Sequence, residues 1–165
     1  MNYGAVKKFD IADGPGVRVS LFVSGCRHHC KGCFQPETWD FDYGEPFTEQ
    51  VKQEIFEALA PEYIQGFTLL GGEPFEPENQ KELAGLVTEI RKEFPEKDIW
   101  CYTGYTYDVD LVPGGKVYTD YTEEMLAGID VLVDGEFIEE KKNLTLQFRG
   151  SSNQRIIHLH EDTSK

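Results

Sequence analysis

The chain has 165 residues and a formal net charge of −14, and 39% of its residues are hydrophobic and 13% aromatic. This length fits a single domain, residues 1–165, that buries a core without disulfides, and only residues 161–165 are expected to be loosely held. The negative charge argues against a nucleic-acid partner, and no uncharged apolar run approaches the roughly 20 residues that a membrane span requires. With no apolar segment near its start, the protein is expected to stay in the cytoplasm.

The first predicted strand is Val17–Val23, a β-branched and apolar run between turns that contain glycine. A helix is predicted to follow Thr48, a favoured N-cap residue, and to end before Pro61. Its apolar face holds residues at helical spacing: Val51, Ile55, Phe56 and Leu59. Residues 66–70 predict the second strand.

The clearest predicted helix begins at Pro77 and ends before Pro95. Apolar residues recur along it at helical spacing: Leu83, Leu86, Val87, Ile90 and Phe94. Two more buried strands are predicted at residues 99–102 and 131–133, with a short helix near residues 122–127 between them. A last strand is predicted at residues 155–159.

Alternating strands and helices predict an α/β fold with a mostly parallel sheet and right-handed crossovers. An eight-stranded βα barrel usually takes about 250 residues, so this chain should form a partial, open βα barrel. Unusual sequences follow four of the predicted strands, at residues 25–34, 71–74, 103–105 and 134–135. Because ligand sites form at the carboxyl ends of parallel strands, these four segments are expected to meet in one cleft.

Cys26, Cys30 and Cys33 follow a C-x3-C-x2-C spacing in the first of these segments. Thiolates are soft ligands that suit iron–sulfur clusters or zinc. A four-iron cluster that only carries electrons is normally held by four cysteines, whereas this loop supplies three. One iron would therefore keep an open position at which a substrate can bind.

A structural zinc site remains an alternative, in which His28 or His29 completes a Cys3His set. If the metal is a cluster, both histidines are expected to be solvated loop residues. Cys101 lies in an apolar run and is expected to be a small buried hydrophobic residue rather than a fourth ligand. A plain electron carrier would need such a fourth ligand.

Three motifs resemble those of the radical S-adenosylmethionine superfamily. Residues 26–34 match its C-x3-C-x2-C-aromatic loop, and residues 71–74 (GGEP) resemble its GGE element after the second strand. Residues 13–18 (DGPGVR) resemble the start shared by enzymes that activate glycyl-radical proteins, although the segment alone is only a turn. The resemblance implies a partial barrel of the radical S-adenosylmethionine type.

Residues 100–105, 131–137 and 148–154 further resemble the activating proteins of anaerobic ribonucleotide reductases. This resemblance implies reductive cleavage of S-adenosylmethionine at a 4Fe–4S cluster and formation of a glycyl radical on the large reductase subunit. It also implies a one-electron donor such as a flavodoxin-like protein. The alternatives are an activating enzyme for another glycyl-radical protein, another small radical S-adenosylmethionine enzyme, and a zinc-stabilised binding module.

The resemblance assigns the cluster to Cys26, Cys30 and Cys33, and it implies no catalytic side chain beyond the cluster and cofactor. The residues implied to bind the cofactor are Gly32, Cys33, Phe34, Gly71, Gly72, Glu73 and Asp134. The glycines permit close backbone approach, Glu73 offers a hydrogen bond to the cofactor's ammonium group, and Phe34 could stack on adenine. Asp134 could equally be a turn residue at the end of a strand. Arg149 and Asn153 could contact the cofactor or a partner, or could simply belong to a polar loop.

Overall fold

The computed structural model describes residues 1–160, so the expected loose segment, residues 161–165, lies outside the described residues. Within this part of the chain, seven strands form one sheet with the order β3-β1-β2-β4-β5-β6-β7. The strands are β1 (Asn2–Asp10), β2 (Val17–Val23), β3 (Glu45–Pro46), β4 (Ile64–Gly71), β5 (Asp98–Tyr102), β6 (Val131–Asp134) and β7 (Arg155–His158). The architecture is mixed α/β.

The four central strands, β2, β4, β5 and β6, pair in parallel, as predicted from their alternation with helices. The sheet margins differ from that prediction, because β1 pairs with β2, β3 with β1, and β7 with β6 in antiparallel fashion. The sequence analysis missed β1 because most of its residues are polar or only partly buried, and pairing with β2 holds it in place.

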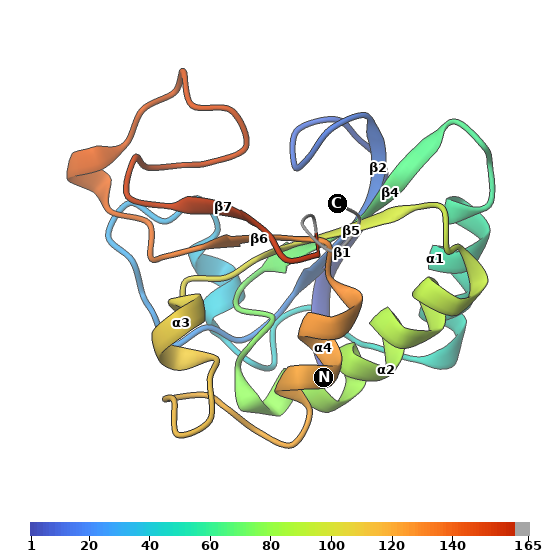
Figure 1. Ribbon diagram of the computed structural model, residues 1–165, viewed down its shortest axis with the longest axis horizontal. Helices are drawn as coiled ribbons and strands as arrows, with labels where there is room; N and C mark the ends of the chain where they lie inside the picture. The colour runs from blue at the N-terminus through green and yellow to red at the C-terminus, as the bar shows by residue number, and fades with distance from the viewer. Residues whose placement is uncertain (161–165) are drawn as a thin grey trace.

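Three helices cover one face of the sheet (Figure 1): α1 (Glu49–Leu59), α2 (Pro77–Glu93) and α4 (Thr122–Gly128). The Thr48 hydroxyl accepts a hydrogen bond from the Val51 N–H at 3.4 Å, which confirms the predicted N-cap of α1. The shorter helices are α3 (Tyr107–Asp110) and the 3-10 turns η1 (Pro36–Trp39) and η2 (Glu139–Lys141). They lie in the connections that follow β5, β2 and β6.

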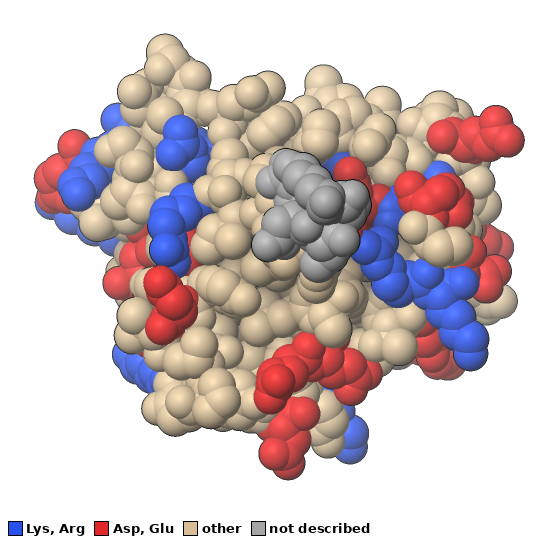
Figure 2. Space-filling view, in the orientation of Figure 1, with Lys and Arg blue, Asp and Glu red and all other residues tan. Residues whose placement is uncertain are grey.

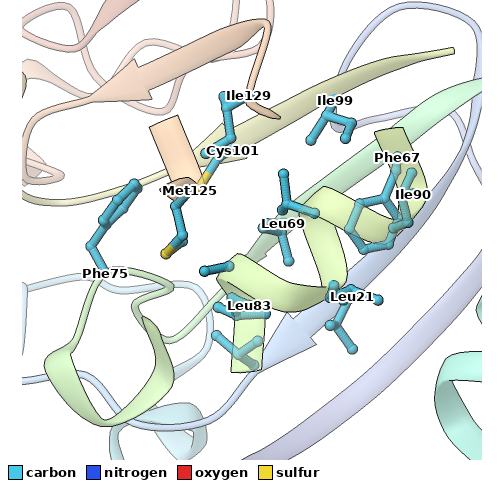
Figure 3. Close-up of a cluster of buried hydrophobic side chains, with 14 of the residues drawn as sticks. Leu21, Phe67, Leu69, Phe75, Leu83, Ile90, Ile99, Cys101, Met125 and Ile129 are labelled. Atoms are coloured by element: carbon cyan, nitrogen blue, oxygen red, sulfur yellow. The ribbon is translucent and has the colours of Figure 1, made fainter. Parts of the chain in front are cut away.

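The main hydrophobic core lies between these helices and the sheet. Figure 3 shows Leu21, Leu69 and Cys101 of the strands facing Leu83 of α2 and Met125 of α4. Successive side chains of a strand point to opposite faces, so only alternate strand residues enter this core. The residues between them face the other side of the sheet.

Arg18 lies on that other face and is fully buried. Its guanidinium donates hydrogen bonds to the Thr68 hydroxyl at 2.8 Å and to the carbonyls of Pro15 and Phe67 at 3.0 Å each. The same group pairs with the Asp98 carboxylate at 2.6 Å. Arg18 therefore fastens the turn before β2 to β4 and β5, which is a structural role for the last residue of the DGPGVR segment.

Charged side chains of both signs are dispersed over the face of the protein in Figure 2. On the helical side, the Lys52 ammonium pairs with the carboxylates of Glu49 at 2.8 Å and Glu89 at 2.7 Å, which links α1 to α2. Exposed pairs of this kind contribute little to stability. No helix within residues 1–160 is long and apolar enough to cross a membrane.

Arg18→Met is expected to lower the free energy of unfolding by about 3 kcal/mol, because it leaves the Asp98 carboxylate without its cation and removes one donor from each of two backbone carbonyls. Urea unfolding followed by circular dichroism measures this change. Lys92→Met, at an exposed position of α2, is the control and should change the free energy by no more than about 0.5 kcal/mol. Equal stability of the two variants would contradict the assigned role of Arg18.

Candidate active site

A cavity of about 560 Å³ lies against the sheet face opposite the helices. Phe22 of β2, Leu70 of β4 and Tyr102 of β5 form part of its floor. Its walls include the cysteine loop (residues 24–34) and the segment 135–154, which lie near each other at one end of the sheet in Figure 1. Segments far apart in the sequence thus meet at the carboxyl ends of the parallel strands, as predicted.

The backbone of the cysteine loop is held by hydrogen bonds to η1 and within itself. The Cys26 N–H donates to the Trp39 carbonyl at 3.1 Å, and the Cys33 N–H donates to the Cys30 carbonyl at 3.1 Å. The first bond fixes the loop where it leaves β2, and the second closes a turn between two cysteines. This backbone geometry brings the three cysteines to the same cavity.

All three thiols line this cavity: Cys26, which is buried, and Cys30 and Cys33, which are partly exposed. Burial raises the pKa of the Cys26 thiol to about 12, and burial also raises the pKa of Cys30, with Glu136 adding to the rise. Without a metal the two thiols therefore hold their protons, which metal binding would release. Three sulfur donors in one cavity are a set that suits an iron–sulfur cluster.

The GGEP loop (residues 71–74) packs directly on the start of the cysteine loop. The Gly72 N–H donates to the Val23 carbonyl and the Glu73 N–H donates to the Gly25 carbonyl, each at 2.8 Å. A Cβ atom at Gly72 would lie 2.7 Å from the Gly25 carbonyl oxygen, so a larger residue would push the two loops apart. Gly72 therefore allows the GGEP loop and the cysteine loop to pack closely against each other.

The Glu73 carboxylate is fully buried and has four hydrogen-bond partners. One oxygen, Oε1, lies 2.8 Å from His28 Nε2 and accepts from the Gly104 N–H at 2.7 Å. The other, Oε2, accepts from the Phe75 N–H at 2.8 Å and from the Thr103 hydroxyl at 2.6 Å. These partners occupy the roughly four lone-pair positions of a carboxylate, so direct contact with an ammonium group would require one of them to move.

Glu76, which the sequence analysis missed, is a second buried carboxylate in the same region. It accepts from the Arg27 backbone N–H at 2.6 Å, from the Arg27 guanidinium at 3.0 Å and from the Tyr105 hydroxyl at 2.9 Å. It therefore fixes the backbone between the first two cysteines. Its position three residues after Glu73, before α2, is the only signal of this role in the sequence.

The two histidines of the cysteine loop behave differently, and the expectation that both are solvated is wrong for His28. The His28 side chain is only 9% exposed and lies between the carboxylates of Glu73 and Glu136. Burial lowers its pKa, but these two carboxylates outweigh burial and hold the pKa above its ordinary value. His29 is exposed, as expected, and stacks on Trp39 with ring centroids 4.4 Å apart.

These contacts bear on the zinc alternative. Both ring nitrogens of His28 already face carboxylate oxygens, at 2.8 Å and 3.1 Å, so His28 could ligate zinc only by giving up one of them. Within residues 1–160, no group of three or more His, Cys, Asp and Glu side chains is arranged to hold a single metal ion. The contacts of the two histidines therefore argue against a zinc site made of three cysteines and one histidine.

Cys101 is fully buried in the core on the helical side of the sheet, as predicted. Its neighbour Tyr102 lines the cavity on the opposite side. Because the period of a strand is two residues, the Cys101 thiol faces away from the other three. The thiols of the cavity are therefore those of the cysteine loop, among the described residues.

Phe34 follows the last cysteine, lines the cavity and keeps 64% of its surface exposed. The centroid of the Phe34 ring lies 5.2 Å from that of Phe137, and the Lys142 ammonium lies 5.4 Å from the centroid of the Phe34 ring. The segment 135–154 thus covers part of Phe34. Gly32, another residue implied to bind a cofactor, is exposed and is not among the described residues that line the cavity.

Asp134 lies outside the lining of the larger cavity, beside a smaller one of about 360 Å³. Its buried carboxylate binds the Arg155 guanidinium at 2.5 Å and 2.9 Å and accepts from the Tyr107 N–H at 2.8 Å. Asn153 also lines the smaller cavity, whereas Arg149 lines the larger one. Of these three weaker candidates, the structure brings only Arg149 to the cysteines.

Asp13 of the DGPGVR segment also lines the larger cavity. Burial and a hydrogen bond with Asp10 raise the pKa of its carboxyl group to about 7. Asp10 is buried, accepts from the Ser20 hydroxyl at 2.6 Å and from the Ala12 N–H at 2.8 Å, and has a lowered pKa. Asp13 at the cavity and the buried Asp10 beside it therefore form a pair of carboxyl groups that carries a single negative charge over part of the pH range below neutrality.

Residues 12–157 match the protein family described as "4Fe-4S single cluster domain". The chain is 42% identical to the anaerobic ribonucleoside-triphosphate reductase-activating protein of Enterobacteria phage T4, over 94% of this chain and 93% of the relative. It is 43% identical to the protein of that name from Escherichia coli K12, over 96% and 99% of the two chains, and 41% identical to the one from Vibrio cholerae, over 96% and 97%. The chain therefore belongs to the family of anaerobic ribonucleoside-triphosphate reductase-activating proteins.

Proposed function

We propose that this protein activates the large subunit of an anaerobic ribonucleoside-triphosphate reductase by reductive cleavage of S-adenosylmethionine at a 4Fe–4S cluster. The observation that carries the proposal is that Cys26, Cys30 and Cys33 line one cavity together with the GGEP loop. The relatives are named for the activation of such a reductase. In this proposal the mixed sheet is a partial barrel of the radical S-adenosylmethionine type.

Cys26, Cys30 and Cys33 would hold the cluster at this cavity. With S-adenosylmethionine bound, the cluster would supply one-electron reductive cleavage of a carbon–sulfur bond, and the 5′-deoxyadenosyl group released with methionine would serve to abstract a hydrogen atom from a backbone glycine of the reductase. A flavodoxin-like protein or another one-electron donor would reduce the site. Four free cysteines among the described residues agree with a reducing compartment, the cytoplasm.

The protein's own contribution would be to bind, orient and shield the reacting groups. Gly71 and Gly72 expose the backbone of the GGEP loop to the cavity, where it can receive the amino end of the cofactor. Arg149 lines the same cavity, and its Nε atom is buried without a hydrogen-bond partner. A cofactor carboxylate is the partner that a guanidinium in this position would favour.

The nearest rival function is activation of a different glycyl-radical protein. The chain is at least 41% identical, over nearly their full lengths, to three proteins named as activating proteins of this reductase, which favours the ribonucleotide reductase as partner. Incubation with the purified candidate partners separates the two functions. The protein that acquires a glycyl-radical signal in electron paramagnetic resonance is the substrate.

The test of the proposed function is anaerobic reconstitution with iron and sulfide, followed by metal analysis and electron paramagnetic resonance of the reduced protein. We expect about four irons and four sulfides per chain and a spectrum that changes when S-adenosylmethionine is added. Cys30→Ala should fall well below this iron content because it removes one of three cluster ligands. The signal of the full protein should disappear after exposure to oxygen.

Cys101→Ala is the matched control, since it removes a thiol that faces the opposite side of the sheet. Its iron and sulfide content should equal that of the unchanged protein. About one zinc per chain without sulfide would refute the cluster and support a binding module. A cluster whose spectrum does not change when S-adenosylmethionine is added would instead support an electron carrier.

Phe34→Ala is expected to weaken the binding of S-adenosylmethionine by about 5- to 150-fold, because base stacking on one aromatic ring contributes about 1 to 3 kcal/mol. Iron and sulfide content should stay unchanged, because Phe34 supplies no ligand. Isothermal titration calorimetry of the reconstituted protein measures the affinity.

Phe9→Ala is the control for this prediction. Phe9 is similarly exposed, at 68% against 64% for Phe34, and its ring likewise contacts one aromatic ring, that of Tyr63. It does not line the larger cavity, so its replacement should leave the affinity unchanged. The same affinity for Phe34→Ala and Phe9→Ala would remove Phe34 from the cofactor site.

A further inference from the structure

His28 connects three loops that border the larger cavity. Its Nε2 atom lies 2.8 Å from a carboxylate oxygen of Glu73, and its Nδ1 atom lies 3.1 Å from one of Glu136. We propose that His28 is a positioning residue, which holds the Glu73 carboxylate and thereby keeps the GGEP loop in the form that binds S-adenosylmethionine. This proposal rests on the proposed function, because it concerns the same site.

The position of the His28 ring is closely defined. The ring lies 4.3 Å from that of Tyr105, measured between centroids, and a Cβ atom at Gly104 would come within 2.6 Å of His28 Nε2. Glycine at 104 therefore leaves the space that the ring occupies. Tyr105 and Gly104 belong to the loop after β5, so the ring joins this loop to the cysteine loop.

His28 and Thr103 are the two side chains that contact the Glu73 carboxylate. The partners of its Oε2 atom are the Phe75 N–H and the Thr103 hydroxyl, and the second partner of its Oε1 atom is the Gly104 N–H. Without His28, a buried carboxylate oxygen would keep a single donor. Such an oxygen gains from turning toward water, which would loosen its bonds to the loops after β4 and β5.

His28 also forms part of the boundary between the two cavities. His28, Gly104 and Gly135 are lining residues of both the cavity of about 560 Å³ and the cavity of about 360 Å³. Since the other two shared residues are glycines, the imidazole is the main side chain at this boundary. Its removal would open the larger cavity toward the smaller, polar one and admit water next to Glu73.

The experiment compares the full chain with His28→Ala, His28→Gln and His28→Asn after anaerobic reconstitution. A glutamine amide can place a donor near the position of Nε2, toward Glu73, whereas an asparagine amide can replace only Nδ1, toward Glu136. Calorimetry measures the affinity for S-adenosylmethionine, metal analysis measures iron and sulfide, and electron paramagnetic resonance reports the response of the cluster to the cofactor.

We expect all three variants to retain iron and sulfide. His28→Ala and His28→Asn should bind S-adenosylmethionine about tenfold more weakly, the effect of losing one hydrogen bond to a charged group, and the spectral response should need correspondingly more cofactor. His28→Gln should stay within about threefold of the unchanged protein, because it restores the donor to Glu73. This order separates positioning of Glu73 from a general loss of packing.

His29→Asn is the control within the same loop, because it changes the neighbouring exposed histidine to a residue that tolerates its positive φ of 49°. This variant should bind the cofactor as the unchanged protein does. Unchanged affinity in His28→Ala, equal affinities in His28→Asn and His28→Gln, or loss of iron in His28→Ala would overturn the role of His28. Failure of the unchanged protein to bind a cluster or S-adenosylmethionine would overturn the proposed function itself.

Discussion

Two fully buried carboxylates, Glu73 and Glu76, hold together the loops that follow β2, β4 and β5. A carboxylate without solvent is costly unless hydrogen-bond donors surround it, so each of these groups must collect donors from neighbouring loops. Glu76 takes them from Arg27 and Tyr105, and Glu73 takes them from residues that include His28 and Thr103. The cysteine loop therefore cannot move independently of the GGEP loop, because a shift of either would leave a buried charge without its partners.

The sheet supplies the second constraint by keeping two different environments on its two faces. On the helical face, Leu21 and Leu69 belong to an apolar core, whereas Arg18, three residues before Leu21, and Thr68, next to Leu69, lie on the other face. That second face carries buried polar groups and the floor of the cavity. A small protein can thus build a stable core and a polar site from the same central strands, because successive side chains point in opposite directions.

Much of this arrangement could be predicted from local patterns. Local residue preferences and hydrophobic periodicity predict three of its elements, and tertiary contacts only reinforce them: the strand Val17–Val23, the helix capped by Thr48 and the helix that begins at Pro77. The grouping of the cysteine and GGEP loops followed from their places after parallel strands. The strand β1 could not be predicted, because its polar residues are ordered by pairing with β2. The roles of His28 and Glu76 were also hidden, since their partners lie between 29 and 108 residues away in the chain.

The register of β5 links the fold to the proposed chemistry. Cys101 pairs with Leu132 of β6 and points into the core, while Tyr102 faces the cavity with the cysteine loop. A shift by one residue would exchange the two faces, bringing a fourth thiol to the cavity side and burying a tyrosine hydroxyl among apolar residues. The buried hydroxyl would oppose such a shift. The same hydrophobic pattern that stabilises the sheet thus limits the cavity to the thiols of the cysteine loop, which is the condition for an iron with an open position in the proposed cluster.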